Sequence, residues 1–160
     1  MNATHLHLML NHIPVIGTGF ALLLLLVALA KRSDEWKKVS LWFFVLIALL
    51  TVPAYVTGEP AEDGVKGLPG IAKAVIEQHE EAAGVAFGGT ALVGVLALTG
   101  LVRFRRGRPV PGWFAGAIVL LAVIAGGLMA WAANLGGQVR HTEIRAGSAS
   151  PQPTEERGGR

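Results

Sequence analysis

The residues with the most distinctive chemistry in this 160-residue chain are its histidines. They are His5, His7, His12, His79 and His141. Neutral imidazole is a common ligand of metal ions and of haem iron. The absence of cysteine excludes disulfides, cysteine-ligated zinc, iron–sulfur clusters and c-type haem attachment. No nucleophile–base pair and no phosphate-binding loop is recognisable in the sequence. The histidines therefore favour a bound metal or haem over bond-making chemistry by the chain itself.

Long apolar blocks must position these histidines. Hydrophobic residues make up 52% of the chain, charged residues only 16%, and the mean hydropathy is +0.50. The blocks run over about 6–30, 39–56, 82–102 and 113–135. Each is close to the roughly 20 residues that a helix needs to cross a bilayer. The sequence predicts an all-α fold, an integral membrane four-helix bundle over residues 1–145, followed by a disordered tail at 146–160.

Counting the crossings places all the histidines on one side of the membrane. The start of the first span, the start of the third and the end of the fourth share that side. His12 lies about a turn inside its span, where polar residues usually face the bundle interior. His5 is seven residues from His12 and would share its helix face. We expect His12 and His79 to form the best facing pair, with His7 and His141 as a second pair or His141 replacing one member. Structural hydrogen bonding, or an ordinary interfacial position, is the alternative for each.

The basic residues predict the orientation and the connections. The first and third loops hold Lys31, Arg32, Lys37, Lys38, Arg103, Arg105, Arg106 and Arg108. The positive-inside rule places these loops in the cytoplasm, and both termini and the central loop outside. The pI of about 9.7 reflects these short loops and indicates no nucleic-acid surface. In the central outer loop, 68–70 predicts a turn, and 71–78 has the apolar spacing of a short amphipathic helix leading into the third span.

Glycines at two kinds of position suggest close approaches. Pairs four residues apart are Gly84 with Gly88 and Gly112 with Gly116. Such spacing lets helices approach closely, either within the chain or in a dimer. The glycines at 136–137 lie near the end of the fourth span. They could admit a flat ligand, or they could end the helix as a C-cap.

One segment resembles a known family. His7 to Val15, HLMLNHIPV, is similar to the opening HPxxxHFPI of small bacterial membrane proteins called DUF2231. The family also has four spans, a histidine at the start of the third, and an LGGxLVYxHG-like segment after the fourth. His79 and the segment LGGQVRH, 135–141, occupy these places here. Leu8 replaces the family's first proline, and His141 follows the glycines at a shorter distance. The resemblance implies a bacterial inner (cytoplasmic) membrane protein, redox-linked and with b-type haem.

The expected function is that of a membrane b-type cytochrome, an electron-transfer subunit more than a stand-alone enzyme. Haem would lie between the outer ends of the helices, with ligands drawn from His12, His79, His7 and His141. The expected partners are the lipid bilayer, a quinone, and a redox protein or larger membrane complex. One alternative is a non-haem copper or zinc site built from His12, His79 and His141 with Glu80 or Glu81. Another is a cofactor-free structural accessory subunit. Haem iron needs one or two histidines, whereas copper or zinc needs three or four converging ligands.

Overall fold

The computed structural model describes residues 2–67, 71, 73–141 and 144–145. Its helices are α1 (Ala3–Leu10), α2 (His12–Ala30), α3 (Asp34–Val56), α4 (Gly58–Asp63), α5 (Lys73–Arg103) and α6 (Gly112–Arg140). Among the described residues, four helical segments are long and apolar enough to cross a bilayer: Ala3–Ala30, Asp34–Asp63, Lys73–Arg103 and Gly112–Val139. The predicted all-α, four-span membrane bundle is confirmed. The turn predicted at 68–70 and the tail predicted at 146–160 lie outside the described residues.

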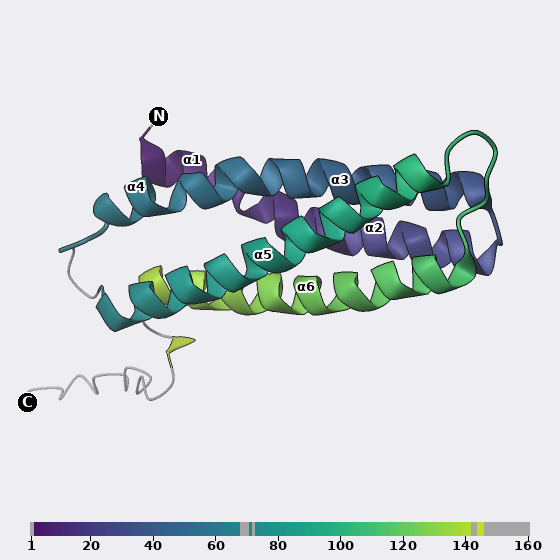
Figure 1. Cartoon of the computed structure of the whole chain (residues 1–160). Coiled ribbons are helices and arrows are strands. Elements are labelled where there is room, and N and C mark those ends of the chain that lie inside the picture. The colour runs from purple at the N-terminus through teal and green to yellow at the C-terminus, as the bar shows by residue number, and fades with distance from the viewer. Residues whose placement is uncertain (1, 68–70, 72, 142–143, 146–160) are drawn as a thin grey trace, which may run out of the picture.

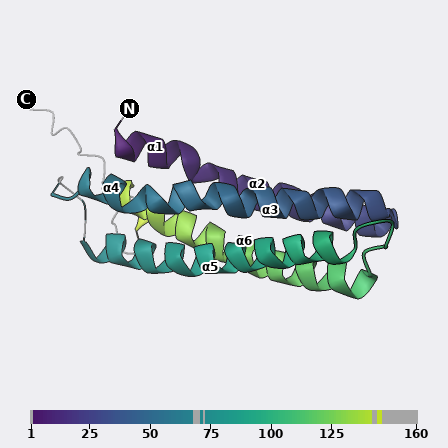
Figure 2. The ribbon, with the colours of Figure 1, turned by 45° about the horizontal axis from the view of Figure 1, so that its top comes forward.

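The helices form two antiparallel hairpins, α2 with α3 and α5 with α6, stacked as two layers (Figures 1 and 2). Contacts close the bundle into a ring, because α2 packs on α3, α3 on α5, α5 on α6, and α6 on α2. The short helices α1 and α4 lie at the end of the bundle that holds the N-terminus (Figure 1). The start of α5 and the end of α6 lie at this same end.

A turn at Asn11 divides the first span into α1 and α2. Pro14 explains the division, because it lacks the N–H that would bond to the carbonyl of Leu10 one turn earlier. α1 has its own N-cap, in which the Asn2 side chain accepts a hydrogen bond from the backbone N–H of His5 at 2.9 Å. Asn11 nevertheless keeps helical φ and ψ angles, −65° and −21°, and its N–H bonds to the His7 carbonyl one turn earlier at 2.9 Å. The helix phase therefore carries from α1 into α2.

The central loop differs from its predicted form. The stretch predicted as a short amphipathic helix is helical from Lys73 onward, but it forms the first turns of α5. This stretch has strong helix-forming residues and no glycine or proline, and the Lys73–Glu77 ion pair at 3.2 Å adds a local contact. The helix thus begins well before the apolar block. Hydropathy shows which part of the helix contacts lipid, but it does not show where the helix starts. The short helix of this loop is α4, directly after α3.

Small side chains make up much of the core. Buried alanines occur along every long helix: Ala21, Ala28, Ala54, Ala82, Ala86, Ala97, Ala115, Ala122, Ala125 and Ala132. A few larger side chains, such as Leu25, Leu41 and Phe44, lie between them. Many other large apolar side chains point outward, as in Ile16 at 69% exposed, Leu49 at 64% and Leu120 at 62%. This inverts the arrangement of a water-soluble bundle and matches one that is surrounded by lipid.

The closest helix approaches do not occur at the spaced glycine pairs. A Cβ added at Gly88, Gly112 or Gly116 would meet nothing within 4 Å. The prediction of a helix contact within the chain is therefore wrong for these three glycines. It holds for Gly84, where a Cβ would lie 3.7 Å from the Tyr55 hydroxyl of α3. The tight positions are Gly94, where a Cβ would overlap that of Ala48 on α3, and Gly100, where it would meet the Phe114 ring at 2.5 Å.

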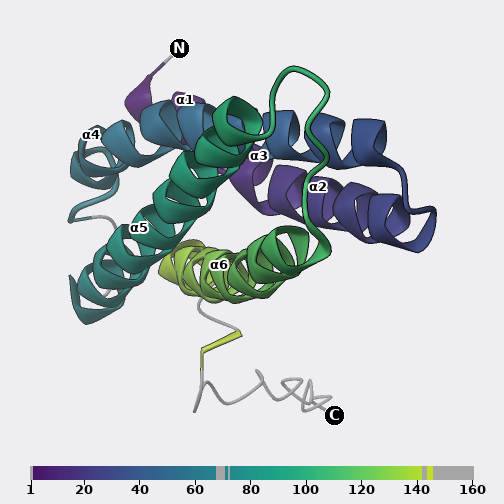
Figure 3. The ribbon, with the colours of Figure 1, turned by 45° about the vertical axis from the view of Figure 1, so that its right-hand side comes forward.

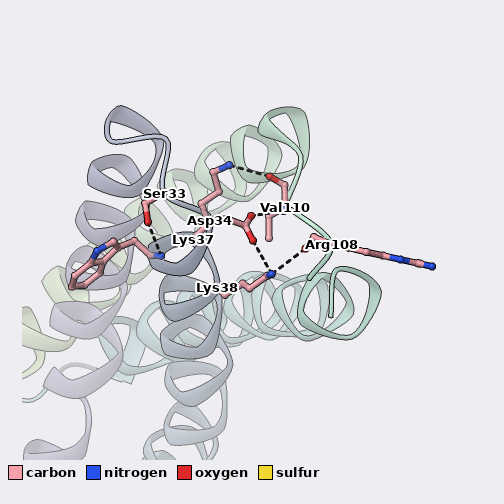
Figure 4. Close-up of polar contacts among 7 residues, drawn as sticks. Ser33, Asp34, Lys37, Lys38, Arg108 and Val110 are labelled. Atoms are coloured by element: carbon pink, nitrogen blue, oxygen red, sulfur yellow. Dashed lines mark hydrogen bonds and ion pairs between the residues drawn. The ribbon is translucent and has the colours of Figure 1, made fainter. Parts of the chain in front are cut away.

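The two basic loops meet at the end of the bundle opposite α1 and α4 (Figures 3 and 4). Asp34 joins them, because its carboxylate accepts a hydrogen bond from the backbone N–H of Val110 and lies 2.7 Å from Lys38 Nζ. Lys37 donates to the Val110 carbonyl and Lys38 to the Arg108 carbonyl, each at 3.0 Å. These bonds confirm that both basic loops lie at one end.

Candidate functional site

The histidine end of the bundle is the candidate site. His7 lies on α1 and His79 on α5, and the two imidazoles are close enough for their charges to interact when both are protonated. Both are half-buried. They come from helices that are far apart in sequence but lie at the same end of the bundle (Figure 1). A ligand site in a helical bundle draws its ligands from different helices, and these two imidazoles meet that condition.

His7 is held against the end of α3. Its Nδ1 lies 3.0 Å from the Ala54 carbonyl and 3.2 Å from Thr57 Oγ1. The Ala54 carbonyl is one of the last four of α3, which lack partners within their own helix. The Thr57 hydroxyl in turn donates to the carbonyls of Pro53 and Ala54. The end of α3 thereby fixes both the position and the rotation of the imidazole.

His79 is held in the same way by α6. Its Nδ1 lies 2.9 Å from the Ala132 carbonyl. The ring rests on Gly136, where a Cβ would lie 3.0 Å from His79 Cε1. A side chain at this position would push the imidazole away from its carbonyl. Gly136 lies close to a flat group, but that group is the chain's own imidazole, so the admission of a flat ligand at 136–137 stays a prediction. The C-cap role is wrong, because α6 continues to Arg140.

The acceptors determine the protonation of both rings. A carbonyl oxygen can only accept a hydrogen bond, so Nδ1 of His7 and of His79 must carry the proton. In the neutral ring, Nε2 then has a free lone pair. Neither Nε2 is hydrogen-bonded within the described part of the chain. An N–H fixed by a backbone carbonyl is the usual arrangement behind a metal-bound histidine.

His12 does not face the interior, contrary to the expectation from its depth in the span. Its side chain is exposed, and its Nδ1 lies 2.8 Å from the Leu8 carbonyl one turn earlier. His12 lies five residues after His7, about 140° round the helix, and shares the outward face of His5, seven residues before it. His5 and His141 are also exposed, and His141 is the residue that follows α6. The half-buried members of the expected ligand set are therefore His7 and His79, in place of the expected pair of His12 and His79.

Apolar and aromatic side chains follow the histidine end toward the middle of the bundle. Ala132, whose carbonyl binds His79, belongs to a cluster with Ala82, Ala86 and Met129. Tyr55, near the end of α3, stacks on Phe87 of α5 with ring centroids 4.6 Å apart. Asn11 Oδ1 is buried and has no hydrogen-bond partner among the described residues. A group or water molecule bound at this end could satisfy that oxygen.

The acidic residues of this end lie toward α4. The Glu80 carboxyl group lies against Glu62 of α4, and the partner of the His79 Nδ1 is the Ala132 carbonyl. Glu80 is therefore not the hydrogen-bond partner that orients the His79 imidazole. Hydrogen bonds to Glu62 and Asp63 raise the pKa of Lys66 above its usual range, so this lysine stays charged. α4 and the turn after it thus carry a cluster of charged residues at the histidine end of the bundle.

Comparison with protein-family models, with curated proteins and with solved structures finds no match to this chain. The resemblance to the DUF2231 proteins remains a prediction, and the site has to be interpreted from its own geometry.

The donor set fits haem better than a non-haem metal ion. Within the described ranges, no group of three or more histidine, cysteine, aspartate or glutamate side chains is placed to hold a metal ion. Copper and zinc sites need three or four such ligands. The site brings together two imidazoles, which is the number that haem iron uses. Sequence reasoning could not find their partners, because backbone carbonyls at 54 and 132 leave no signal in the residue types.

Proposed function

We propose that this chain is a membrane electron-transfer subunit of the b-type cytochrome kind, with His7 and His79 as the ligands of its haem. One observation carries the proposal: two half-buried imidazoles from different helices each donate Nδ1–H to a backbone carbonyl and keep Nε2 free. Coordination to iron through Nε2 would use the one ring position that the chain leaves open. Bound haem would supply a one-electron couple at this end of the bundle.

The chain's own residues would orient the ligands and exclude water. The Ala54 and Ala132 carbonyls hold the imidazoles in the required tautomer and increase their basicity as ligands. The apolar side chains around Ala132 keep the site dry and lower the local dielectric constant. The proposed partners are a quinone in the bilayer and a redox protein or larger membrane complex. The location proposed for the subunit is the bacterial inner membrane.

A second candidate rests on the same hydrogen bonds. His7 ties α1 to α3, and His79 ties α5 to α6, so each imidazole also serves as an interhelical contact. In a cofactor-free accessory subunit of a membrane complex, holding the helices together would be the only role of these histidines. In that case the free Nε2 atoms would have no ligand role, and both histidines would affect stability alone.

An absorption spectrum separates the two candidates. The full chain is purified in mild detergent from membranes of haem-replete cells, and spectra are taken oxidised and after dithionite reduction. The cytochrome proposal expects a Soret band and, on reduction, the sharp α-band of a b-type haem. Extraction into alkaline pyridine then gives the haem content per chain. A wild-type protein that lacks these bands removes the cytochrome proposal and leaves the accessory role.

The membrane orientation can be tested with single cysteines, because the natural chain has none. We expect Glu35→Cys, exposed in the first basic loop, to be labelled by an impermeant maleimide only after the cells are opened. Lys73→Cys, exposed at the histidine end, is the matched control and should be labelled in intact cells. Glu35 is preferable to Ser33, whose hydroxyl caps α3 by accepting from the N–H of Trp36. The reverse labelling pattern would place the basic loops outside.

A further inference from the structure

The basic end of the bundle holds a groove that the electron-transfer proposal does not use. It has a volume of about 800 Å³ and lies beside the last turns of α5. Four arginines line one part of it: Arg103, Arg105, Arg106 and Arg108. The remaining lining comes from α5, mainly from Leu98 and Val102. The groove therefore combines concentrated positive charge with an apolar wall.

The apolar wall continues toward the middle of the membrane. Val102 is 55% exposed, Leu98 45%, Val95 61% and Leu92 50%. These residues recur at intervals of three or four, so they form one outward stripe along α5. No described segment covers this stripe, since each of these side chains is exposed. It offers an acyl chain a continuous apolar surface that ends at the arginines.

No described carboxylate neutralises the positive charge of the groove. None of its four arginines forms an ion pair with a carboxylate in the part of the chain that the structure describes. Asp34, the nearest acidic group of α3 in the hydrogen-bonded network, is already bound to Lys38 and to the Val110 N–H (Figure 4). Guanidinium groups bind phosphate oxygens through paired, charge-assisted hydrogen bonds.

The loop that carries the arginines has a defined backbone. It turns at Arg106 and Gly107, whose φ angles are 56° and 79°. Its far end is fixed by the bonds from Asp34, Lys37 and Lys38 to the backbone at 108 and 110. The arginines are thus presented from an anchored turn at the level where the apolar stripe ends.

We propose that this groove binds an anionic phospholipid of the adjacent leaflet. The arginines would bind its phosphate, and Leu98 and Val102 would contact the start of an acyl chain. A free phosphate ion would satisfy the arginines but would leave the apolar wall unused, which is why the lipid is the occupant that the lining favours. Basic pockets beside membrane-spanning helices are suited to this task.

The test measures lipid retention by the purified full-length protein in native mass spectrometry. Phosphatidylglycerol is compared with phosphatidylcholine of the same acyl chains. We expect the wild type to retain phosphatidylglycerol selectively, and Arg105→Gln/Arg106→Gln to weaken that retention by about tenfold or more. Equal retention of the two lipids by the wild type would overturn the proposal.

A matched control removes the same charge elsewhere at the same end. Lys31→Gln/Arg32→Gln also lowers the net charge by two, and Arg32, like Arg106, has a positive φ, at 52°. We expect this variant to retain phosphatidylglycerol like the wild type. An equal loss of phosphatidylglycerol retention in both double variants would show nonspecific attraction to a basic surface and would overturn the proposal that the groove binds the lipid.

A third variant distinguishes a lipid from a free anion. Val102→Asn should weaken phosphatidylglycerol retention without affecting any competition by inorganic phosphate. Unchanged lipid retention in Val102→Asn, together with full displacement of the lipid by inorganic phosphate, would make the groove an anion site and contradict the lipid assignment. Circular dichroism and gel filtration check that each variant is folded.

Discussion

Replacing either His7 or His79 with alanine is expected to abolish the haem absorption bands of the purified protein. Each substitution removes one of the two half-buried imidazoles whose Nε2 is free, and leaves the other ligand alone. The lost hydrogen bond should lower the free energy of unfolding by only about 1 kcal/mol, so the bundle should remain folded. Haem content per chain, measured beside circular dichroism, separates loss of the ligand from loss of the fold.

The control for this experiment is His12→Ala. His12 lies at the same end of the bundle but is exposed, and bonds only to its own helical segment through Leu8. We expect its haem spectrum to match that of the wild type. If His12→Ala loses the bands and His7→Ala keeps them, His12 is the ligand and the assignment of His7 is wrong. Restoration of the bands in His79→Gly by added imidazole would identify ligation directly.

Gly94→Ala is expected to destabilise the bundle by about 1–3 kcal/mol. A Cβ at this position would overlap the Cβ of Ala48 and lie 3.6 Å from the Phe44 carbonyl, so α3 and α5 would have to move apart. Neither contact is with the flexible end of a side chain that could swing away. Thermal unfolding in detergent, followed by circular dichroism, measures the effect.

Two further variants make the Gly94 experiment specific. Gly88→Ala adds the same methyl group to the same helix, where a Cβ meets nothing within 4 Å. It should leave stability unchanged or raise it by up to about 1 kcal/mol through helix propensity. Combining Gly94→Ala with Ala48→Gly should recover part of the loss, because the clash lies between these two methyl groups. Equal stability of Gly94→Ala and Gly88→Ala would show that the helices do not approach closely here.

Hydropathy alone was sufficient to predict the four crossings, because lipid demands about 20 apolar residues per span whatever the details of packing. Counting crossings then placed the histidines at one end. Helix limits were less predictable. α5 begins at Lys73 because charged residues such as Glu77 are good helix formers, so the helix extends beyond the apolar block. The spacing of residues does not show where a membrane surface cuts across a continuous helix.

The orientation of individual side chains could not be predicted, for physical reasons. His12 is the deepest histidine along its span, but depth does not show which face of the helix meets the bundle, and His12 lies on the exposed face. His7 is held in place by Ala54 and Thr57 at the end of α3, which lie 47 and 50 positions after it in the sequence. Such a tertiary contact cannot be read from the local sequence. Glycine spacing failed similarly, because Gly94 faces Ala48 while Gly88 faces open space.

The alanine-filled interior determines which substitutions the sequence can accept over evolutionary time. Where a core consists of large side chains, most losses come from truncation, and neighbouring residues can partly relax into the gap. Here positions such as Ala21, Ala97 and Ala122 are fully buried and have almost no volume left to remove. The destabilising substitutions at these positions are those to larger residues, which would push the helices apart. The lipid-facing side chains can meanwhile exchange one large apolar residue for another, so sequence drift should concentrate on the outside of the bundle.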